Sequence, residues 1–178
     1  MSGLIKDNKL QQLDTQLFYQ LNRNSKSSII KLSKWLSKSG DGYLYLVISI
    51  ATVMLHQEYD TRFLKTALLA FAIELPVYLI LKNIVKRHRP FDKLASYQSH
   101  IAPSDKFSMP SGHSGAAFLF ATIVSFYYPE LSMLAYTWAT GIALSRVLLG
   151  VHFPSDTVIG ALLGIACAEI AIDAFLLL

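Results

Sequence analysis

Two basic residues separated by one heptad stand where an apolar stretch gives way to a polar loop. Lys82 and Arg89 are followed directly by Pro90. Seven residues are close to two helical turns, so both cations project from one face of a continued helix. Pro90 disfavours helix in the residue before it and predicts that the element ends there. The pair can clamp an anion, although cations at the end of a membrane helix often only extend their head groups to water.

A second cluster, Pro110-Ser111-Gly112-His113, directly precedes another apolar run. Ser111 is a favourable helix N-cap, and the first backbone N–H groups of such a helix have no partner within it. Gly112 lets another group approach the backbone closely. A helix N-terminus of this kind favours an anion, and His113 stands at its mouth. A single histidine in this place is, however, more often an ordinary interfacial side chain.

The third cluster joins Arg146 to His152 and Asp156. Arg146 ends an apolar run, and Phe153-Pro154-Ser155 predicts the start of the next helix, where proline is tolerated in the first turn. A separation of four residues lets the Asp156 carboxylate reach one imidazole nitrogen of His152. This contact would fix the tautomer and leave the other nitrogen as a nucleophile. Taken alone, the pair is equally compatible with a structural role or with half of a metal site.

Composition places these clusters in a single membrane domain. The 178 residues suit one domain, and a hydrophobic fraction of 53% exceeds what a globular core of this size hides from water. The net charge is +4, but the basic residues flank apolar segments and form no stripe with aromatics. This arrangement favours anionic lipid head groups and argues against a nucleic-acid partner. Cys167 is the sole cysteine, so no disulfide framework is expected, and no cleavable signal peptide is predicted.

The hydrophobic pattern predicts an all-α polytopic transmembrane bundle of five to six spans. Leucines at three- and four-residue spacing predict amphipathic helices over 4–21 and 27–38, lying along the membrane interface. Within the single domain 1–178, residues 1–40 are the interfacial region and 41–178 the transmembrane catalytic core. The predicted spans are 43–55, 66–81, 114–128, 131–149 and 157–178.

Four residues interrupt these apolar segments. Glu74 and Pro76 lie in the second span, and Glu169 and Asp173 lie in the fifth. Carboxylates at that depth are costly unless they face protein or water. A structural role in the bundle interior and a functional role are equally compatible with this pattern, so none of the four is assigned a function.

An up-and-down connection of five spans puts all three clusters on one side of the membrane, because they end spans two and four and begin spans three and five. Three cations, a helix N-terminus, two histidines and a carboxylate then meet in one pocket. This inventory suits phosphoryl transfer, which needs charge stabilisation, a nucleophile and a proton donor. Metal-dependent hydrolysis fits less well because carboxylate ligands are scarce. No glycine-rich P-loop is present.

The stretches KNIVKRHRP, PSGH and SRVLLGVHFPSD resemble the three-part signature of the type 2 phosphatidic acid phosphatase superfamily. That group also includes glucose-6-phosphatase and the vanadium haloperoxidases. The resemblance implies that His152 attacks phosphorus and that Asp156 orients it. It further implies that His113 protonates the leaving oxygen and then acts as the base for water. No metal and no cofactor are implied. By the same resemblance, the phosphate is held by Lys82, Arg89, Ser111, Gly112 and Arg146.

The resemblance implies a lipid phosphatase of the undecaprenyl pyrophosphate, phosphatidylglycerophosphate or phosphatidate class, whose substrate keeps its tail in the bilayer. A lipid phosphotransferase using the same phosphohistidine is an open alternative. A non-catalytic lipid-binding membrane protein is another, and the intact set of catalytic groups argues against it. The loop cations Lys86, Arg87 and His88 suit a diphosphate, although exposed loop cations are usually only solvated.

The expected location is the cell (inner) membrane, as a multi-pass protein. An active site facing the periplasm or exterior is expected from the resemblance to phosphatases of envelope lipids. The lysine-rich N-terminal region gives the opposite orientation by the positive-inside rule if there are five spans.

Overall fold

The protein is built from helices joined by loops. The computed structural model describes residues 9–23, 25–55, 61–94, 97–103 and 105–177, and no strand occurs within these ranges. The all-α prediction is therefore confirmed. The helices, in chain order, are α1 (Lys9–Asn22), α2 (Ser27–Ser39), α3 (Gly42–Leu55), α4 (Arg62–Val85), α5 (Pro90–Lys93), α6 (Gly112–Tyr127), the 3-10 helix η1 (Pro129–Leu131), α7 (Ser132–Leu148) and α8 (Pro154–Leu176).

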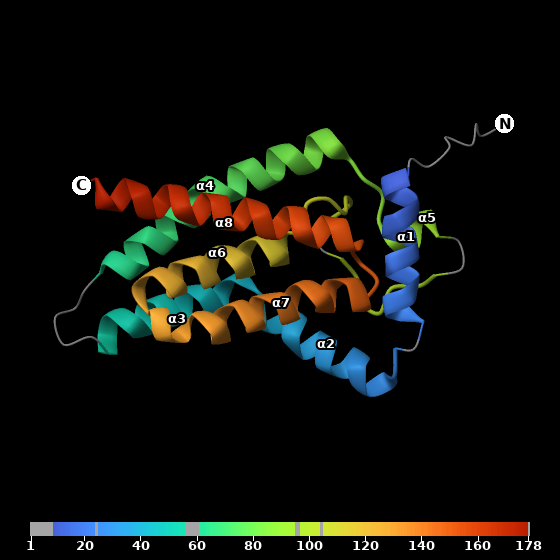
Figure 1. Ribbon diagram of the computed structural model, residues 1–178, viewed down its shortest axis with the longest axis horizontal. Helices are drawn as coiled ribbons and strands as arrows, with labels where there is room; N and C mark the ends of the chain where they lie inside the picture. Colours follow the sequence, from blue (N-terminus) through green and yellow to red (C-terminus); the bar gives the residue numbers. More distant parts are fainter. Residues whose placement is uncertain (1–8, 24, 56–60, 95–96, 104, 178) are drawn as a thin grey trace.

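Helix α6 lies at the centre of the bundle and packs against α4, α7 and α8 (Figure 1). Its contact with α8 is a contact between backbones. A Cβ atom added at Gly164 would lie 2.0 Å from the Gly115 carbonyl oxygen, and one at Gly160 would lie 2.4 Å from the Ser111 carbonyl oxygen. Small residues at such positions let membrane helices approach closely. The close approach brings the first turn of α6 next to the first turn of α8.

Two segments are long and apolar enough to cross a membrane. These are Arg62–Lys93, which contains α4, and Pro154–Leu176, with mean hydropathies of 1.9 and 2.0. Helix α3 is apolar but shorter, and α6 and α7 have 16 and 17 residues. The count of five to six spans stays a prediction. Large apolar side chains on the outer faces of α4 and α8 are exposed, as lipid contact requires: Leu68, Leu75, Leu79, Ile80, Ile84, Val158, Leu162 and Ile170.

The second predicted span is longer than expected. Helix α4 extends beyond 66–81 at both ends, and Pro76 lies inside it without ending it. Glu74 is buried in the bundle interior, where a Cβ atom at Gly115 would lie 2.7 Å from its Oε1 atom. Glu169 and Asp173 are exposed on α8. The carboxylates that interrupt the spans therefore differ in environment.

Helix α1 runs across the end of the bundle, at a large angle to the other helices (Figure 1). It buries Asp14 and Phe18, and the Phe18 ring packs edge-on against Tyr97 and Phe153. Residues 4–8 of the predicted amphipathic segment lie outside the described residues. The interfacial position of α1 and α2 stays a prediction, but both helices turn apolar side chains away from the protein: Leu10, Leu13, Leu17, Leu21, Ile29, Leu32 and Trp35.

Candidate active site

The three polar clusters meet at the end of the bundle that α1 covers. The C-terminus of α4, the N-terminus of α6 and the turn between α7 and α8 all lie there (Figure 1). Main-chain hydrogen bonds join them. Ser111 N donates to the Asp156 carbonyl at 2.9 Å, and Ser108 N donates to the Arg87 carbonyl at 2.9 Å. The backbone thereby fixes the second cluster against the other two.

Lys82 and Arg89 form a clamp around the carboxylate of Asp105. Lys82 Nζ lies 2.8 Å from Asp105 Oδ2, and Arg89 Nη2 lies 2.8 Å from Asp105 Oδ1. Arg89 Nη1 also donates to the Val151 carbonyl at 2.7 Å, which ties the clamp to the third cluster. Burial alone would raise the pKa of Asp105, but the hydrogen bonds and charges of Lys82 and Arg89 outweigh burial and lower it. Helix α4 ends at Val85 and Lys86 has a left-handed conformation, so the prediction that both cations project from one face of a continued helix is wrong. The loop after α4 brings Arg89 to Asp105, and the anion that the two cations hold here is a side chain.

His152 is buried, with 2% of its surface exposed. Its Nε2 atom lies 3.5 Å from Arg89 Nη1, and its Nδ1 atom lies 3.8 Å from Asp156 Oδ2. The second distance is an electrostatic contact and too long for a hydrogen bond. Within the described ranges, Nδ1 has no hydrogen-bond partner. The pKa of His152 is lowered to about 4, chiefly by burial; the charges of Arg146 and Arg89 also lower it, and Asp156 opposes them.

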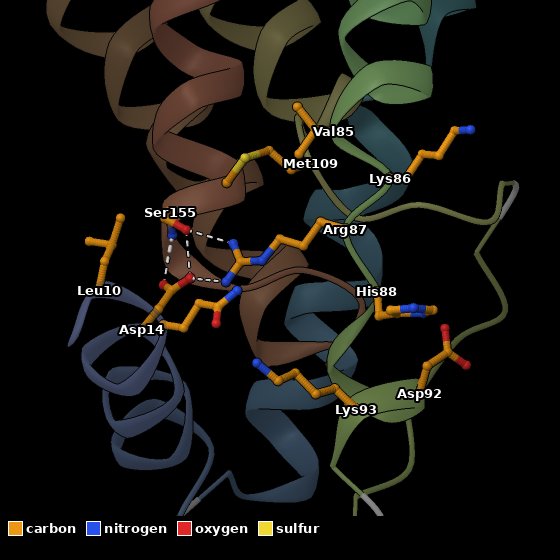
Figure 2. A pocket seen from close by; sticks show the side chains of 11 residues that line it. Leu10, Asp14, Val85, Lys86, Arg87, His88, Asp92, Lys93, Met109 and Ser155 are labelled. Atoms are coloured by element: carbon orange, nitrogen blue, oxygen red, sulfur yellow. Dashed lines mark hydrogen bonds and ion pairs between the residues drawn. The ribbon is translucent and has the colours of Figure 1, made fainter. Parts of the chain in front are cut away.

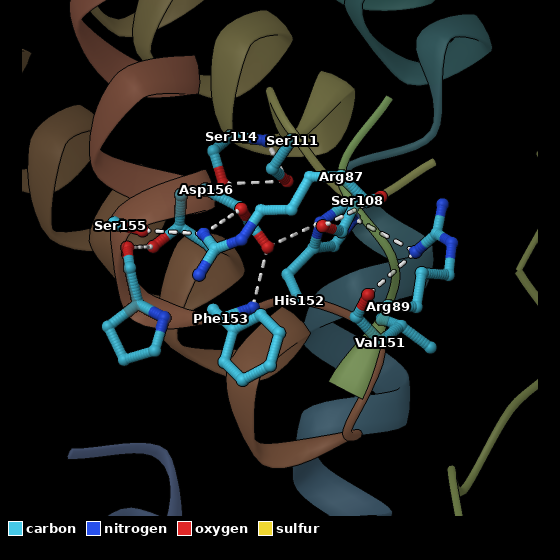
Figure 3. A network of polar contacts seen from close by, with 12 residues as sticks. Arg87, Arg89, Ser108, Ser111, Ser114, Val151, His152, Phe153, Ser155 and Asp156 are labelled. Atoms are coloured by element: carbon cyan, nitrogen blue, oxygen red, sulfur yellow. Dashed lines mark hydrogen bonds and ion pairs between the residues drawn. The ribbon is translucent and has the colours of Figure 1, made fainter. Parts of the chain in front are cut away.

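Asp156 is held by groups other than His152 (Figure 3). Arg87 Nη1 donates to its Oδ1 atom at 2.6 Å, and Phe153 N donates to Oδ2 at 2.7 Å. Arg87 in turn pairs through Nη2 with Asp14 of α1, and Ser155 N donates to Asp14 Oδ1 at 3.0 Å. Only 14% of the Arg87 side chain is exposed. Arg87 is therefore a buried partner of two carboxylates, and the interpretation that it is a solvated loop cation is wrong.

Residues at the start of α6 complete the second cluster. The Ser111 side chain caps the helix by accepting from Ser114 N at 3.5 Å, as expected. Gly112 permits a close approach, because a Cβ atom there would lie 3.1 Å from the Tyr78 ring. The Tyr78 hydroxyl donates to Asp105 Oδ2 at 3.1 Å. Tyr78 therefore connects the N-terminus of α6 to the cation clamp, a contact that the sequence did not indicate.

His113 and Arg146 line a pocket of about 280 Å³ at the mouth of the site. His113 Nε2 lies 3.1 Å from Asp41 Oδ1, at the junction of α2 and α3. The other polar residues of this pocket include Lys34 and Lys38 of α2, which are both exposed. His113 and two additional cations therefore share one opening.

Arg146 is anchored at the base of this pocket. Its Nη1 atom donates to the Ser37 hydroxyl of α2. Its Nε atom is buried, and among the described residues it has no hydrogen-bond partner. A buried guanidinium with an unpaired N–H group is costly unless an anion binds to it. Arg146 is thus available to bind phosphate.

A larger cavity of about 880 Å³ lies on the α1 side of Arg87 (Figure 2). Its lining includes the loop cations Lys86, Arg87 and His88, which the sequence relates to a diphosphate, but no predicted site residue of the three polar clusters. The Arg87–Asp156 pair separates it from His152. Of the predicted site residues, His113 and Arg146 line the smaller pocket, and His152 lines neither cavity.

Three residues of the site could not be identified as such from the sequence: Asp14, Arg87 and Asp105. Asp14 lies in the amphipathic helix and Asp105 in the polar loop, both outside the motifs, whereas Arg87 lies inside the first signature stretch, where it was expected only as a loop cation. The single weak signal was an acidic residue at Asp105 within a basic loop. Among the residues that the structure describes, no group of three or more His, Cys, Asp or Glu side chains is arranged to hold a metal ion.

The sequence was compared with family models and with known proteins. The model of the PAP2 superfamily matches residues 63–176, well over half of the chain. The chain belongs to the PAP2 superfamily. The match contains every motif residue discussed above, so the resemblance of the three signature stretches is confirmed.

Several relatives are lipid phosphatases by name. An undecaprenyl-diphosphatase of Sulfolobus acidocaldarius is 29% identical over 85% of this chain and 73% of its own length. Phosphatidylglycerophosphatase B of Escherichia coli is 34% identical over 50% of this chain, but over only 38% of its own length. The crystal structure of Aquifex aeolicus LpxE superposes with a TM-score of 0.78 at 26% identity, covering 90% of this chain and 95% of the other. The protein is thus a phosphatase of this family and a membrane protein.

Proposed function

We propose that this protein hydrolyses a lipid phosphate or diphosphate through a phosphohistidine formed on His152. The observation that carries the proposal is the environment of the buried imidazole. Its Nε2 atom faces the guanidinium of Arg89, and its Nδ1 atom faces the carboxylate of Asp156. Burial holds the pKa of His152 at about 4, so the ring is neutral and nucleophilic at neutral pH.

In the first step, the Nε2 lone pair of His152 attacks phosphorus and the bond from phosphorus to the lipid oxygen breaks. The negative charge of the bound phosphate favours the protonated form of His113, which then gives its proton to that oxygen. Asp156 stabilises the positive charge that develops on the His152 ring. In the second step, water attacks the phosphohistidine while His113 takes a proton from it. The phosphorus–nitrogen bond then breaks, releasing inorganic phosphate and restoring neutral His152.

Three cations stabilise the negative charge of the phosphoryl group: Lys82, Arg89 and Arg146. Both Arg89 and Lys82 retain N–H groups beyond those bound to Asp105, and Arg146 Nε has no partner among the described residues. The capped N-terminus of α6 adds free backbone N–H groups at Gly112 and His113. Pre-arranged donors of this kind stabilise the transition state without reorganisation.

Metal independence is part of the proposal and follows from the donor set. The cations that act on His152 are the guanidinium groups of Arg89 and Arg146, which repel a divalent cation and already supply positive charge. The carboxylates at the site are each committed to cations, Asp156 to Arg87 and Asp105 to Lys82 and Arg89. Hydrolysis is expected to continue in excess chelator.

The opening beside His113 favours a diphosphate substrate. Because His113 protonates the leaving oxygen, the leaving group lies in the pocket that Lys34 and Lys38 also line. When a lipid diphosphate reacts, the leaving group is a lipid monophosphate, whose negative charge the ammonium groups of Lys34 and Lys38 can stabilise. When a lipid monophosphate reacts, the leaving group is an uncharged alcohol, which these ammonium groups do not stabilise. The carboxylate of Asp41 lies 3.1 Å from His113 Nε2 in this pocket.

The test of the mechanism is phosphate release by detergent-purified protein in excess chelator, from lipid monophosphates and diphosphates. The wild type is expected to turn over at least one lipid, and His152→Ala to be inactive. Rapid acid-free quenching of the wild type with radiolabelled substrate should trap a phosphoprotein that is stable to base and labile to acid. Turnover by His152→Ala would overturn the phosphohistidine mechanism. Label transferred to an added alcohol in place of water would indicate the phosphotransferase.

The test of the substrate class compares a polyprenyl diphosphate with the monophosphate of the same chain. The double variant Lys34→Gln/Lys38→Gln is expected to lower kcat/KM about fivefold to tenfold for the diphosphate and to leave the monophosphate within twofold. Lys31→Gln is the matched control, because Lys31 is exposed on the same helix and does not line the pocket. Equal losses on both substrates would contradict a preference for the diphosphate.

A further inference from the structure

A continuous series of ionic contacts leads from α1 to the candidate nucleophile. Asp14 on α1 pairs with Arg87, Arg87 pairs with Asp156, and Asp156 faces His152 Nδ1. Figures 2 and 3 show the Arg87 side chain turned inward toward Asp14, Ser155 and Asp156. Asp14 and Asp156 are 4% and 0% exposed. Charges buried to this degree are held in fixed places by their partners.

Arg87 controls where the Asp156 carboxylate points. Its Nη1 atom donates a hydrogen bond to Oδ1 of Asp156, while Phe153 N donates to Oδ2. Oδ2 consequently stays 3.8 Å from His152 Nδ1 and does not close to a hydrogen bond. The Arg87 guanidinium lies over the Phe153 ring, 4.4 Å from its centre, which further fixes the plane of the fork.

Asp14 fixes Arg87 from the other side. Its carboxylate accepts from Arg87 Nη2 and also accepts from Ser155 N at 3.0 Å and from the Ser155 hydroxyl. Asp14 thereby joins α1 to the first turn of α8, one residue before Asp156. Without Asp14, the guanidinium would have one carboxylate partner and would be free to rotate about it.

We propose that Arg87 and Asp14 are positioning residues for the reaction, holding the Asp156 carboxylate at the distance and orientation that His152 requires. The proposal rests on the proposed phosphohistidine function. It makes α1 part of the machinery of the site, in addition to any role at the membrane interface. A carboxylate restrained in this way can stabilise the imidazolium that forms during attack without pairing fully with the resting imidazole.

The pH profile distinguishes this role from a structural one. The charged groups that act on His152 are Arg89 after α4, Arg146 on α7 and Asp156 on α8. Removing the Arg87 charge frees Asp156 Oδ1 from its partner and lets the carboxylate turn toward Nδ1, while Arg89 and Arg146 stay in place. The pKa of His152 then rises, so the acid limb of kcat/KM moves to higher pH.

The experiment measures kcat, KM and the pH profile for Arg87→Gln, Arg87→Lys and Asp14→Asn, using a lipid phosphate that the wild type hydrolyses. Arg87→Gln is expected to lower kcat about 10- to 100-fold, as misplaced catalytic groups do, with KM within twofold. Its acid limb should move upward by at least half a pH unit. Asp14→Asn should also lower kcat and move the acid limb upward, but by smaller amounts. Arg87→Lys should recover part of kcat, since an ammonium pairs with Asp156 but cannot form the two-sided fork.

Controls separate positioning from folding and from failure of the proposed function. Arg23→Gln and Asp92→Asn remove exposed charges of the same types nearby and should leave kcat and the pH profile unchanged. Thermal unfolding in detergent is measured for each variant. A loss of kcat that follows unfolding temperature, with an unchanged acid limb, would overturn the positioning role. If the wild type forms no acid-labile phosphoprotein, the proposed phosphohistidine function itself is refuted, whatever the Arg87 variants show.

Discussion

The imidazole of His152 is kept neutral by its surroundings and not by a strong hydrogen bond. It is enclosed between two guanidinium-bearing elements, and its nearest carboxylate is shared with Arg87. The cations of the site already bind one anion, because Lys82 and Arg89 both pair with the Asp105 carboxylate. The two features lead to predictions that do not depend on knowing the lipid.

Acidification should destabilise the wild type more than a His152→Gln variant. The folded pKa of His152 is about 4, below the value of about 6.5 of an unfolded chain. The unfolded state therefore binds more protons between these values, and stability falls as pH falls through this window. At pH 5 the loss from this group is about 2 kcal/mol relative to pH 7.5. Thermal unfolding in detergent at both pH values measures it; parallel slopes for wild type and variant would contradict it.

Asp105→Asn should make the protein more dependent on bound phosphate. Without the carboxylate, Lys82 and Arg89 lose the anion they share, and buried cations without a partner destabilise the fold. Inorganic phosphate or vanadate no longer competes with Asp105 for these donors. The variant is therefore expected to unfold at lower temperature without phosphate and to gain more than the wild type from added vanadate. Asp92→Asn is the control, and an equal gain in wild type and Asp105→Asn would refute the competition.

The residues that the motifs name could be predicted because spacing along one helix or across one turn fixes their geometry. The four-residue spacing of His152 and Asp156, for example, places the carboxylate 3.8 Å from the imidazole Nδ1 atom. Lys82 and Arg89 do not share a helix face, because α4 ends at Val85, and the following loop brings Arg89 to the carboxylate that Lys82 also contacts. Arg87 could not be interpreted in the same way. Its partners, Asp14 and Asp156, are far from it in sequence, and nothing local distinguishes a buried loop arginine from a solvated one.

The contact between α6 and α8 sets the position of the second cluster relative to the third. Their backbones touch at Gly160 and Gly164, where a Cβ atom would meet carbonyl oxygens of α6. Because Ser111 also donates its N–H to the Asp156 carbonyl, any separation of the two helices moves His113 away from the turn that carries His152. Helix packing is therefore part of the geometry of the site.

Gly160→Ala should lower both stability and activity. The added Cβ would lie 2.4 Å from the Ser111 carbonyl oxygen, so the backbone of α6 has to move. Overpacking of this kind typically costs about 1–3 kcal/mol. Gly141→Ala on α7 is the matched control, because its Cβ would lie 3.6 Å from Leu36, an ordinary contact. Thermal unfolding and kcat/KM are measured for both, and normal activity in Gly160→Ala would show that the close contact does not position the site.

At the scale of elements, hydrophobic runs located the central helices well. Helices α6 and α7 begin and end within two residues of the predicted 114–128 and 131–149. Helix α4 begins before the predicted span, at Arg62, and ends at Val85, short of Arg89, where the continued helix was predicted to end. The leucine pattern also located α1, but it did not show that Asp14 and Phe18 would face the protein. The face that a helix buries depends on its partners.

The whole molecule places α1, α2 and the site at the same end of the bundle (Figure 1). A lipid whose tail stays in the bilayer can present its phosphate there, because the pocket opens where the helices end. The basic residues of this end favour a cytoplasmic position by the positive-inside rule. However, Lys34 and Lys38 line the pocket and Arg87 is buried against carboxylates. These cations have local partners or a substrate to bind, so they carry less weight for topology.

We therefore expect the site to face the exterior of the cell membrane, and labelling in intact cells tests this. In a background lacking Cys167, which is buried, a cysteine is placed at Gln98 on the exposed loop near the site. A second is placed at Met133, which is 85% exposed at the opposite end, where α7 begins. A membrane-impermeant maleimide should label Gln98→Cys and spare Met133→Cys until the cells are opened. The reverse pattern would place the site in the cytoplasm, so that the lysines of α1 and α2 would determine the topology after all.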